Sequence, residues 1–128
     1  MGSRTILFVA FGGMLGSVCR YLLVTLVVSL LPFSFPFGTL AVNILGSFVM
    51  GAAVGLAEYY LWMQHDWRIF LTAGFCGGFT TFSAFSLDFA YLVERKSYGL
   101  AGAYAASSVV VSLLAVFAGL YLVRALAS

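Results

Sequence analysis

Four long apolar segments take up almost the whole chain, and this feature most limits what it can fold into. They run from about Arg4 to Leu30, Phe37 to Leu61, Arg68 to Glu94 and Tyr98 to Leu122. A helix needs roughly 20 mostly apolar residues to cross a bilayer. The segments therefore predict an all-α integral membrane protein with four transmembrane helices, folded as a single domain over residues 1–128.

Composition supports a lipid environment and excludes several classes of function. Of the 128 residues, 63% are hydrophobic and 8% are charged, and a soluble domain of this size cannot bury so much apolar surface. The net charge is only +2 and the basic residues are dispersed, which argues against a nucleic-acid partner. The sole histidine, His65, falls in a loop, and no catalytic or metal-ligand constellation accompanies it. We therefore expect no enzymatic activity.

The start of the chain resembles a signal peptide, because Arg4 is followed by apolar residues. The apolar run continues to Leu31 with no clear cleavage site, however. We therefore expect a retained first span.

The distribution of basic residues says little about orientation in the membrane. Four spans place both termini and the second loop on one side, with Arg4, Arg68 and Arg124, and leave Arg95 and Lys96 on the other. Orientation follows the asymmetry of Lys and Arg, and three against two is almost no asymmetry. Either one orientation prevails, with a cytoplasmic N-terminus, or both coexist. If both coexist, two chains can form an antiparallel dimer.

Small residues mark surfaces where helices can approach closely. Gly12 and Gly16 form one four-residue repeat, and Gly51 and Gly55 form another, a spacing typical of helix packing in membranes. The two cysteines, at positions 19 and 76, lie in apolar segments without a second thiol or a histidine nearby. We expect them to be small buried hydrophobic residues rather than a disulfide or a metal site.

The third segment contains weak helix formers near its centre, Gly77-Gly78 and Thr80-Thr81. They predict a third helix broken at the membrane midplane. Exposed backbone at that depth persists only where it is buried in protein or lines a cavity, and broken helices are typical of ion sites. A glycine-rich packing kink is the alternative.

Three other residues near the middle of the spans have two interpretations each. Asn43 in the second segment can hold helices together or donate a hydrogen bond to an anion. Phe82 and Phe85 share one helix face. They are either ordinary packing residues or present their positive ring edges to an anion.

Tyr104, Ser108 and Ser112 form a stripe of hydroxyls along the fourth segment. They either bond back to their own helix or make a polar track. Arg20, inside the first segment, either reaches the headgroups or sits in a wet vestibule and concentrates anions.

Three motifs stand out in the first three segments. The first is Gly-x-x-x-Arg-Tyr at residues 16–21, and the second is Gly38-Thr39 followed by Val42-Asn43 and Gly46. The third and most specific is the run Gly74-x-x-Gly77-Gly78-x-Thr80-Thr81-Phe82-Ser83. With these motifs and its four spans, the whole chain resembles the Fluc family of fluoride channels, also known as camphor-resistance (CrcB) proteins.

The resemblance implies a passive fluoride-selective channel that exports fluoride across the bacterial inner membrane. It implies an antiparallel, dual-topology homodimer with two pores and a central structural sodium ion, held by the backbone carbonyls of Gly77 and Thr80. It implies a vestibule at Arg20 and a fluoride pore lined by Asn43, Thr81, Phe82, Ser83, Phe85, Tyr104, Ser108 and Ser112.

Two other functions suit a chain of this size. A small proton-coupled multidrug exporter would need a central carboxylate as proton carrier, whereas Glu58 is near the end of its segment and Asp88 is off-centre. A structural subunit of a larger membrane complex would explain the glycines, but it would leave Asn43 and the hydroxyl stripe without a role.

Overall fold

The computed structural model describes residues 2–32 and 34–128, and every regular element in these ranges is helical. The elements are α1 (Ser3–Leu30), α2 (Phe37–Tyr59), η1 (Leu61–Met63), α3 (Asp66–Ile69), η2 (Phe70–Cys76), α4 (Gly77–Phe79), α5 (Phe82–Glu94) and α6 (Tyr98–Ala127). Four stretches are long and apolar enough to cross a membrane: Ser3–Leu30, Phe37–Tyr59, Asp66–Glu94 and Tyr98–Ala127. The prediction of an all-helical, multi-pass membrane protein with four spans is confirmed.

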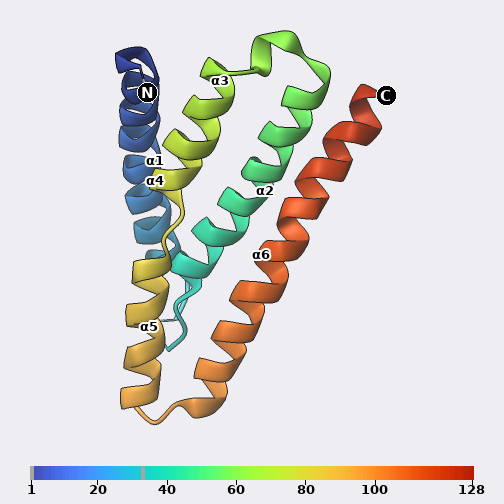
Figure 1. Cartoon of the computed structure of the whole chain (residues 1–128). Coiled ribbons are helices and arrows are strands. Elements are labelled where there is room, and N and C mark those ends of the chain that lie inside the picture. The colour runs from blue at the N-terminus through green and yellow to red at the C-terminus, as the bar shows by residue number, and fades with distance from the viewer. Residues whose placement is uncertain (1, 33) are drawn as a thin grey trace.

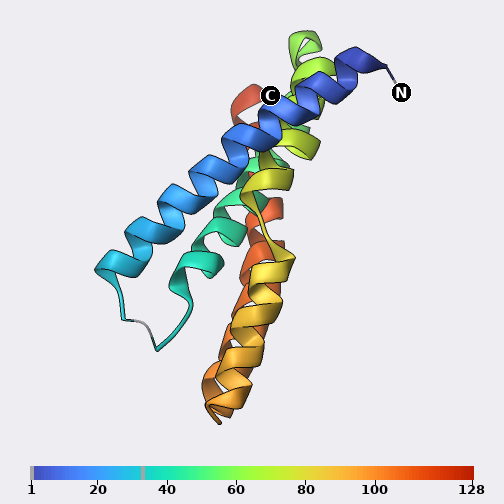
Figure 2. The ribbon, with the colours of Figure 1, turned by 90° about the vertical axis from the view of Figure 1, so that its left-hand side faces the viewer.

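Both chain ends lie at the same end of the bundle as the connection between α2 and α3 (Figure 1). The turn between α5 and α6 lies at the opposite end, as an even number of spans requires. In the perpendicular view α1 is inclined across the other helices (Figure 2). The described ends of the α1–α2 connection contain Pro32 and Pro36, and neither residue can donate a backbone hydrogen bond to continue a helix.

Glycines bring α2 and α6 into close contact. A methyl group added at Gly51 would collide with the carbonyl of Val116, and one added at Gly119 would collide with the carbonyl of Phe48. At Gly55 the added carbon would lie 3.0 Å from Cβ of Val123. The predicted packing role of Gly51 and Gly55 is confirmed.

A second glycine contact joins α1 to the first part of the third span. A carbon added at Gly12 would lie 2.9 Å from Cα of Gly74, and one at Gly78 would lie 2.5 Å from the carbonyl oxygen of Gly13. Gly16 meets the backbone of Phe75 in the same way. The packing role predicted for Gly12 and Gly16 is therefore confirmed, and their partner is the third span.

The third span is not one continuous α-helix. It passes through the π-helix η2 and then α4, before Thr80 and Thr81 adopt extended backbone angles, with ψ of 158° and 114°. Of the two weak pairs named from the sequence, Thr80-Thr81 interrupts the helix, whereas Gly77-Gly78 stays helical, with φ −61° and ψ −38° at Gly77. Gly78 instead provides close packing against α1. The depth of Thr80 and Thr81 in the bilayer stays a prediction.

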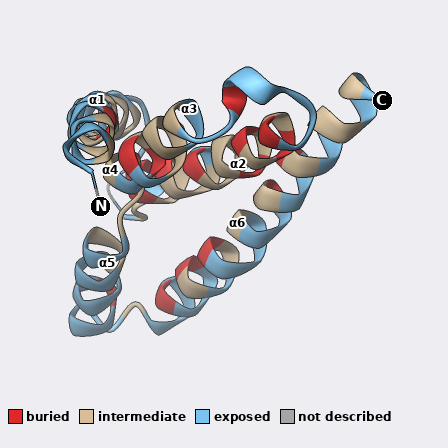
Figure 3. Ribbon diagram, turned by 45° about the horizontal axis from the view of Figure 1, so that its top comes forward, coloured by how far each residue is buried: buried red, intermediate tan, exposed pale blue. Residues whose placement is uncertain are grey.

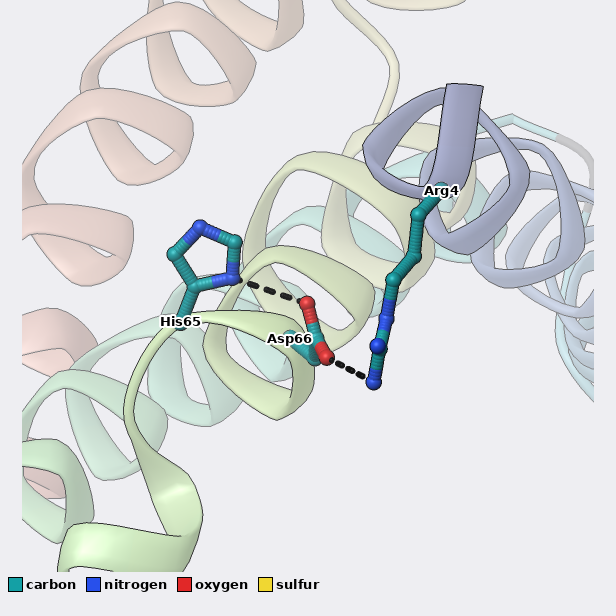
Figure 4. A network of polar contacts seen from close by, with 3 residues as sticks. All are labelled: Arg4, His65 and Asp66. Atoms are coloured by element: carbon teal, nitrogen blue, oxygen red, sulfur yellow. Dashed lines mark hydrogen bonds and ion pairs between the residues drawn. The ribbon is translucent and has the colours of Figure 1, made fainter. Parts of the chain in front are cut away.

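Two ion pairs join spans at the end that holds the termini. Arg124 on α6 binds Glu58 on α2 through two hydrogen bonds of 2.8 Å. Arg4 on α1 lies 2.7 Å from Asp66, whose other carboxylate oxygen is 2.8 Å from Nδ1 of His65 (Figure 4). Both ion pairs lie near the ends of the spans that they connect.

Burial is concentrated on α2, and the outward faces of α1, α5 and α6 are largely exposed (Figure 3). Such apolar surface suits lipid or another subunit. Both cysteines are free thiols; Cys76 is buried as predicted, whereas Cys19 is only half-buried.

Candidate functional site

A cavity of about 300 Å³ opens beside the interruption of the third span, and we call it the break groove. It lies between α2, α5 and α6 and is mainly apolar, with Met50, Val109 and Val116 among its lining. Six of the residues singled out from the sequence line it: Asn43, Thr80, Phe82, Phe85, Ser108 and Ser112. The fold thus brings residues from three separate helices to one surface.

Asn43 holds the interruption in place through both ends of its amide. Its Oδ1 accepts a hydrogen bond of 2.7 Å from the backbone N–H of Thr81, and its Nδ2 donates one of 3.1 Å to the carbonyl of the same residue. The helix-joining interpretation of Asn43 is therefore realised. Because the amide carries two N–H groups, one donor is left over beside the groove.

Thr81 caps the start of α5, and Ser83 lies beside its hydroxyl. Oγ1 of Thr81 accepts a hydrogen bond of 3.1 Å from the backbone N–H of Ala84, as an N-cap side chain does, and lies 3.2 Å from Oγ of Ser83. Neither residue is among those that line the break groove. The structure places both of them beside the groove.

Three aromatic rings form a row that leads from the groove along α5 to α6: Phe82, Phe85 and Tyr104. The ring centroids of Phe82 and Phe85 are 5.5 Å apart, and those of Phe85 and Tyr104 are 5.0 Å apart. Phe82 is 79% exposed in the single subunit, so most of its ring is available to a ligand or a partner. Tyr104 is completely buried and is not a groove residue.

The hydroxyls of α6 differ in their hydrogen bonding. Tyr104 donates to Oδ2 of Asp88 at 3.1 Å, and Ser107 bonds back to the Ala103 carbonyl at 2.7 Å. The buried Oγ of Ser108 has no partner among the residues that the structure describes. A buried hydroxyl without a hydrogen-bond partner is costly, so this site favours a polar ligand in the groove.

Arg20 is not among the residues that line the groove. Its Nε donates a hydrogen bond of 3.0 Å to the carbonyl of Gly78 in α4, and the side chain is partly buried. A cation beside carbonyls at the C-terminal end of a helix is favourable. Arg20 thus satisfies one carbonyl that the interruption leaves without its helical partner.

The two predicted sodium ligands fit a cation that binds carbonyl oxygen. The Thr80 hydroxyl and amide both donate to the Cys76 carbonyl, at 2.8 and 3.0 Å, and the Thr80 carbonyl accepts no hydrogen bond among the described residues. Gly77 is exposed, and an added carbon there would meet nothing closer than the Thr72 carbonyl at 3.9 Å. Within the described ranges no three His, Cys, Asp or Glu residues gather as a metal-binding group. A donor set of carbonyls suits a hard cation.

The sequence analysis missed the contact between Asp88 and Tyr104 and the π-helix η2. Asp88 could have been found, because it continues the three-residue spacing of Phe82 and Phe85 along the same face. No simple sequence signal marks the π-helix.

Known proteins match almost the full length of this chain. The family model described as "CrcB-like protein, Camphor Resistance (CrcB)" matches residues 7–120. The "Fluoride-specific ion channel FluC" of Agrobacterium fabrum is 51% identical over 119 residues, which cover 93% of this chain and 95% of the relative. "Fluoride-specific ion channel FluC 1" of Nitrobacter hamburgensis is 50% identical over 121 residues, covering 94% and 96%. These relatives are named as ion channels and not as enzymes. The chain belongs to the CrcB-like, camphor-resistance family.

Proposed function

We propose that this protein is a passive fluoride-selective channel that exports fluoride. The break groove is the observation that carries the proposal, because it joins Asn43, two phenylalanines and two α6 serines on one surface. The names of relatives about half identical to this chain support fluoride as the ion. They support a channel over a proton-coupled exporter or a structural subunit.

The chemistry of the groove suits a small, strongly hydrated anion. A pore must replace the water that the ion loses, yet bind weakly enough to release it. The unpaired Ser108 hydroxyl and the second N–H of Asn43 are neutral donors. The ring edges of Phe82 and Phe85 add weak positive potential without a full charge. The apolar remainder of the lining keeps the interaction modest.

We further propose that the working unit is an antiparallel homodimer with two pores, formed from chains inserted in both orientations. The near balance of Lys and Arg on the two sides supports dual insertion. The open face of α5, with Phe82 mostly exposed, supports a partner beside the groove.

In this dimer the carbonyls of Gly77 and Thr80 would hold a structural sodium ion. When bound, sodium would offset the mutual repulsion of carbonyl oxygens that meet in a dry interior. This chain's own part is to keep those carbonyls free of other hydrogen bonds. We propose the bacterial inner membrane as the site of action; the four helices long enough to span a membrane and the relatives named as ion channels support a multi-pass membrane protein.

Fluoride efflux from liposomes that contain only the purified protein tests the function. We expect electrogenic fluoride efflux without a proton gradient, and little chloride efflux in the matched control. Drug movement that requires a proton gradient, with no fluoride flux, would contradict the channel.

Reporter fusions at the C-terminus test the dual insertion. We expect reporters on both sides of the membrane, and two lysines added near one terminus should drive all chains one way and abolish activity. A reporter found on one side only would refute the antiparallel dimer.

A further inference from the structure

The interruption at Thr80 and Thr81 separates amides from the carbonyls that a continuous helix would give them. In an α-helix each N–H bonds to the carbonyl four residues earlier. An uninterrupted third span would therefore pair the Thr81 amide with Gly77, and the Ala84 amide with Thr80. Neither pair forms, because the extended backbone directs these groups apart.

Two side chains accept hydrogen bonds from the amides that lack their helical partners. Oδ1 of Asn43 accepts from the Thr81 amide at 2.7 Å, and Oγ1 of Thr81 accepts from the Ala84 amide at 3.1 Å. Both donors are thereby satisfied without any backbone carbonyl. A buried amide without such an acceptor would be costly, so these side chains stabilise the extended conformation.

The matching carbonyls are left free. Among the described residues, no hydrogen bond reaches the carbonyl of Gly77 or Thr80. The Gly78 carbonyl, in contrast, is occupied by Nε of Arg20 at 3.0 Å. The side chains around the interruption thus decide which carbonyls remain available.

Building on the sodium site proposed above, we propose that Asn43 and Thr81 are positioning residues for that site. By binding the two amides, their side chains hold the third span open and keep the Gly77 and Thr80 carbonyls available to a cation. This role is separate from any contact that Asn43 makes with fluoride. The positioning role predicts that two side chains that do not coordinate sodium nevertheless determine the affinity of the site for sodium.

Thr81 allows a matched test. Thr81→Val removes the hydroxyl acceptor and keeps the branched shape, whereas Thr81→Ser keeps the acceptor and loses a methyl group. Asn43→Leu removes the other acceptor at similar size. Without either acceptor, an amide is left to compete for the carbonyls or to recruit water, and both would weaken sodium binding.

The measurement is the unfolding temperature of the purified full-length protein, followed by circular dichroism at fixed protein concentration. Sodium chloride replaces N-methyl-D-glucamine chloride at constant ionic strength. A ligand that binds only the folded state raises its stability with concentration, which yields an apparent dissociation constant. Fluoride efflux is measured separately on the same preparations.

We expect the apparent dissociation constant for sodium to rise about tenfold in Thr81→Val and Asn43→Leu, and to stay near the wild-type value in Thr81→Ser. If Asn43→Leu does not fold, the Thr81 pair alone decides. Wild-type sodium affinity in Thr81→Val would overturn the positioning role, even if fluoride flux fell. A wild-type protein that conducts fluoride but is not stabilised by sodium would overturn it too. Absence of fluoride flux with the expected sodium pattern would refute the proposed function and support the positioning role.

Discussion

The two parts of the third span have opposite surroundings. Before the interruption, Gly74, Cys76 and Phe79 are buried, and the backbone packs against α1 through glycines. After it, Leu92 is the only buried residue of α5, and several large apolar side chains are exposed. In Figure 1 α5 continues from α4 toward the end of the bundle opposite the two chain ends.

The contrast separates the surface that packs within one subunit from the surface that stays exposed in it. The first part packs against α1 of the same chain, so its position is fixed within one subunit. The second part carries the exposed ring of Phe82 and the capped start of α5 to a largely unpacked surface. Lipid or a second subunit must cover that surface, and the break groove lies at the boundary between the two parts.

The largest expected effect comes from adding a side chain in the glycine contact of the first part. In Gly16→Ala the new carbon would collide with the Phe75 carbonyl and lie 2.9 Å from the Phe79 amide, and backbone cannot move aside easily. We expect a loss of about 3 kcal/mol in the free energy of unfolding, measured by denaturant titration in detergent. Gly102→Ala is the control, because nothing lies within 4 Å there, and equal losses would contradict the contrast.

A smaller loss in the free energy of unfolding is expected where α5 packs against α6. Leu92 is 1% exposed and belongs to a cluster with Ala101 and Tyr104. Leu92→Ala should cost about 2 kcal/mol by leaving a cavity. Leu87→Ala, at a position 51% exposed, should leave the stability of the subunit nearly unchanged. A large loss at Leu87 would show that a second subunit covers this face.

The aromatic row gives a test of function at smaller energetic cost. Phe82→Ile and Phe85→Ile keep an apolar side chain but remove the positive ring edge. We expect fluoride efflux to fall by about tenfold, with the oligomer unchanged in gel filtration. Phe89→Ile alters a phenylalanine of the same helix outside the groove and should leave efflux unchanged. Unchanged efflux in both groove variants would show that Phe82 and Phe85 are ordinary packing residues.

The smallest effect is expected from the ion pair that ties the first part to α1. Arg4 is 78% exposed and its partner Asp66 is 23% exposed, so solvent and salt screen the pair. Arg4→Gln should lower the unfolding temperature only slightly at low salt, and the difference should vanish in high salt. A large, salt-independent decrease would mean that this pair, rather than the glycines, fixes the first part.

Prediction from the sequence worked best where one local property decides the outcome. The four spans follow from apolar segments longer than a bilayer requires, and their observed bounds differ from the expected ones by a few residues. Gly12, Gly16, Gly51 and Gly55 were assigned to packing because their spacing leaves room for a second backbone. Of the two weak pairs in the third span only Thr80-Thr81 leaves the helix, because helix propensity ranks glycine as weaker than threonine but does not include the packing of Gly78 against α1.

The candidate site was predictable as a set of residues but not as an arrangement. Asn43 had two interpretations of equal weight, and only the position of Thr81 beside it showed that the amide joins two helices. Ser107 and Ser108 are neighbours of the same type, yet Ser107 bonds to its own helix, whereas Ser108 is buried with no partner in the part of the chain that the structure describes. The difference depends on which side of α6 faces α2, and that is a tertiary property.

The sequence by itself determined that the chain crosses a membrane, how often it does so, and which small residues allow close packing. These outcomes depend on transfer of apolar side chains out of water and on the absence of a side chain, which are properties of single residues. Only the tertiary structure decided which carbonyls stay free at the interruption, that Arg20 binds Gly78, and that Tyr104 binds Asp88. Those outcomes require donors and acceptors from different helices to meet at hydrogen-bond distance, which the order of residues along one helix does not specify.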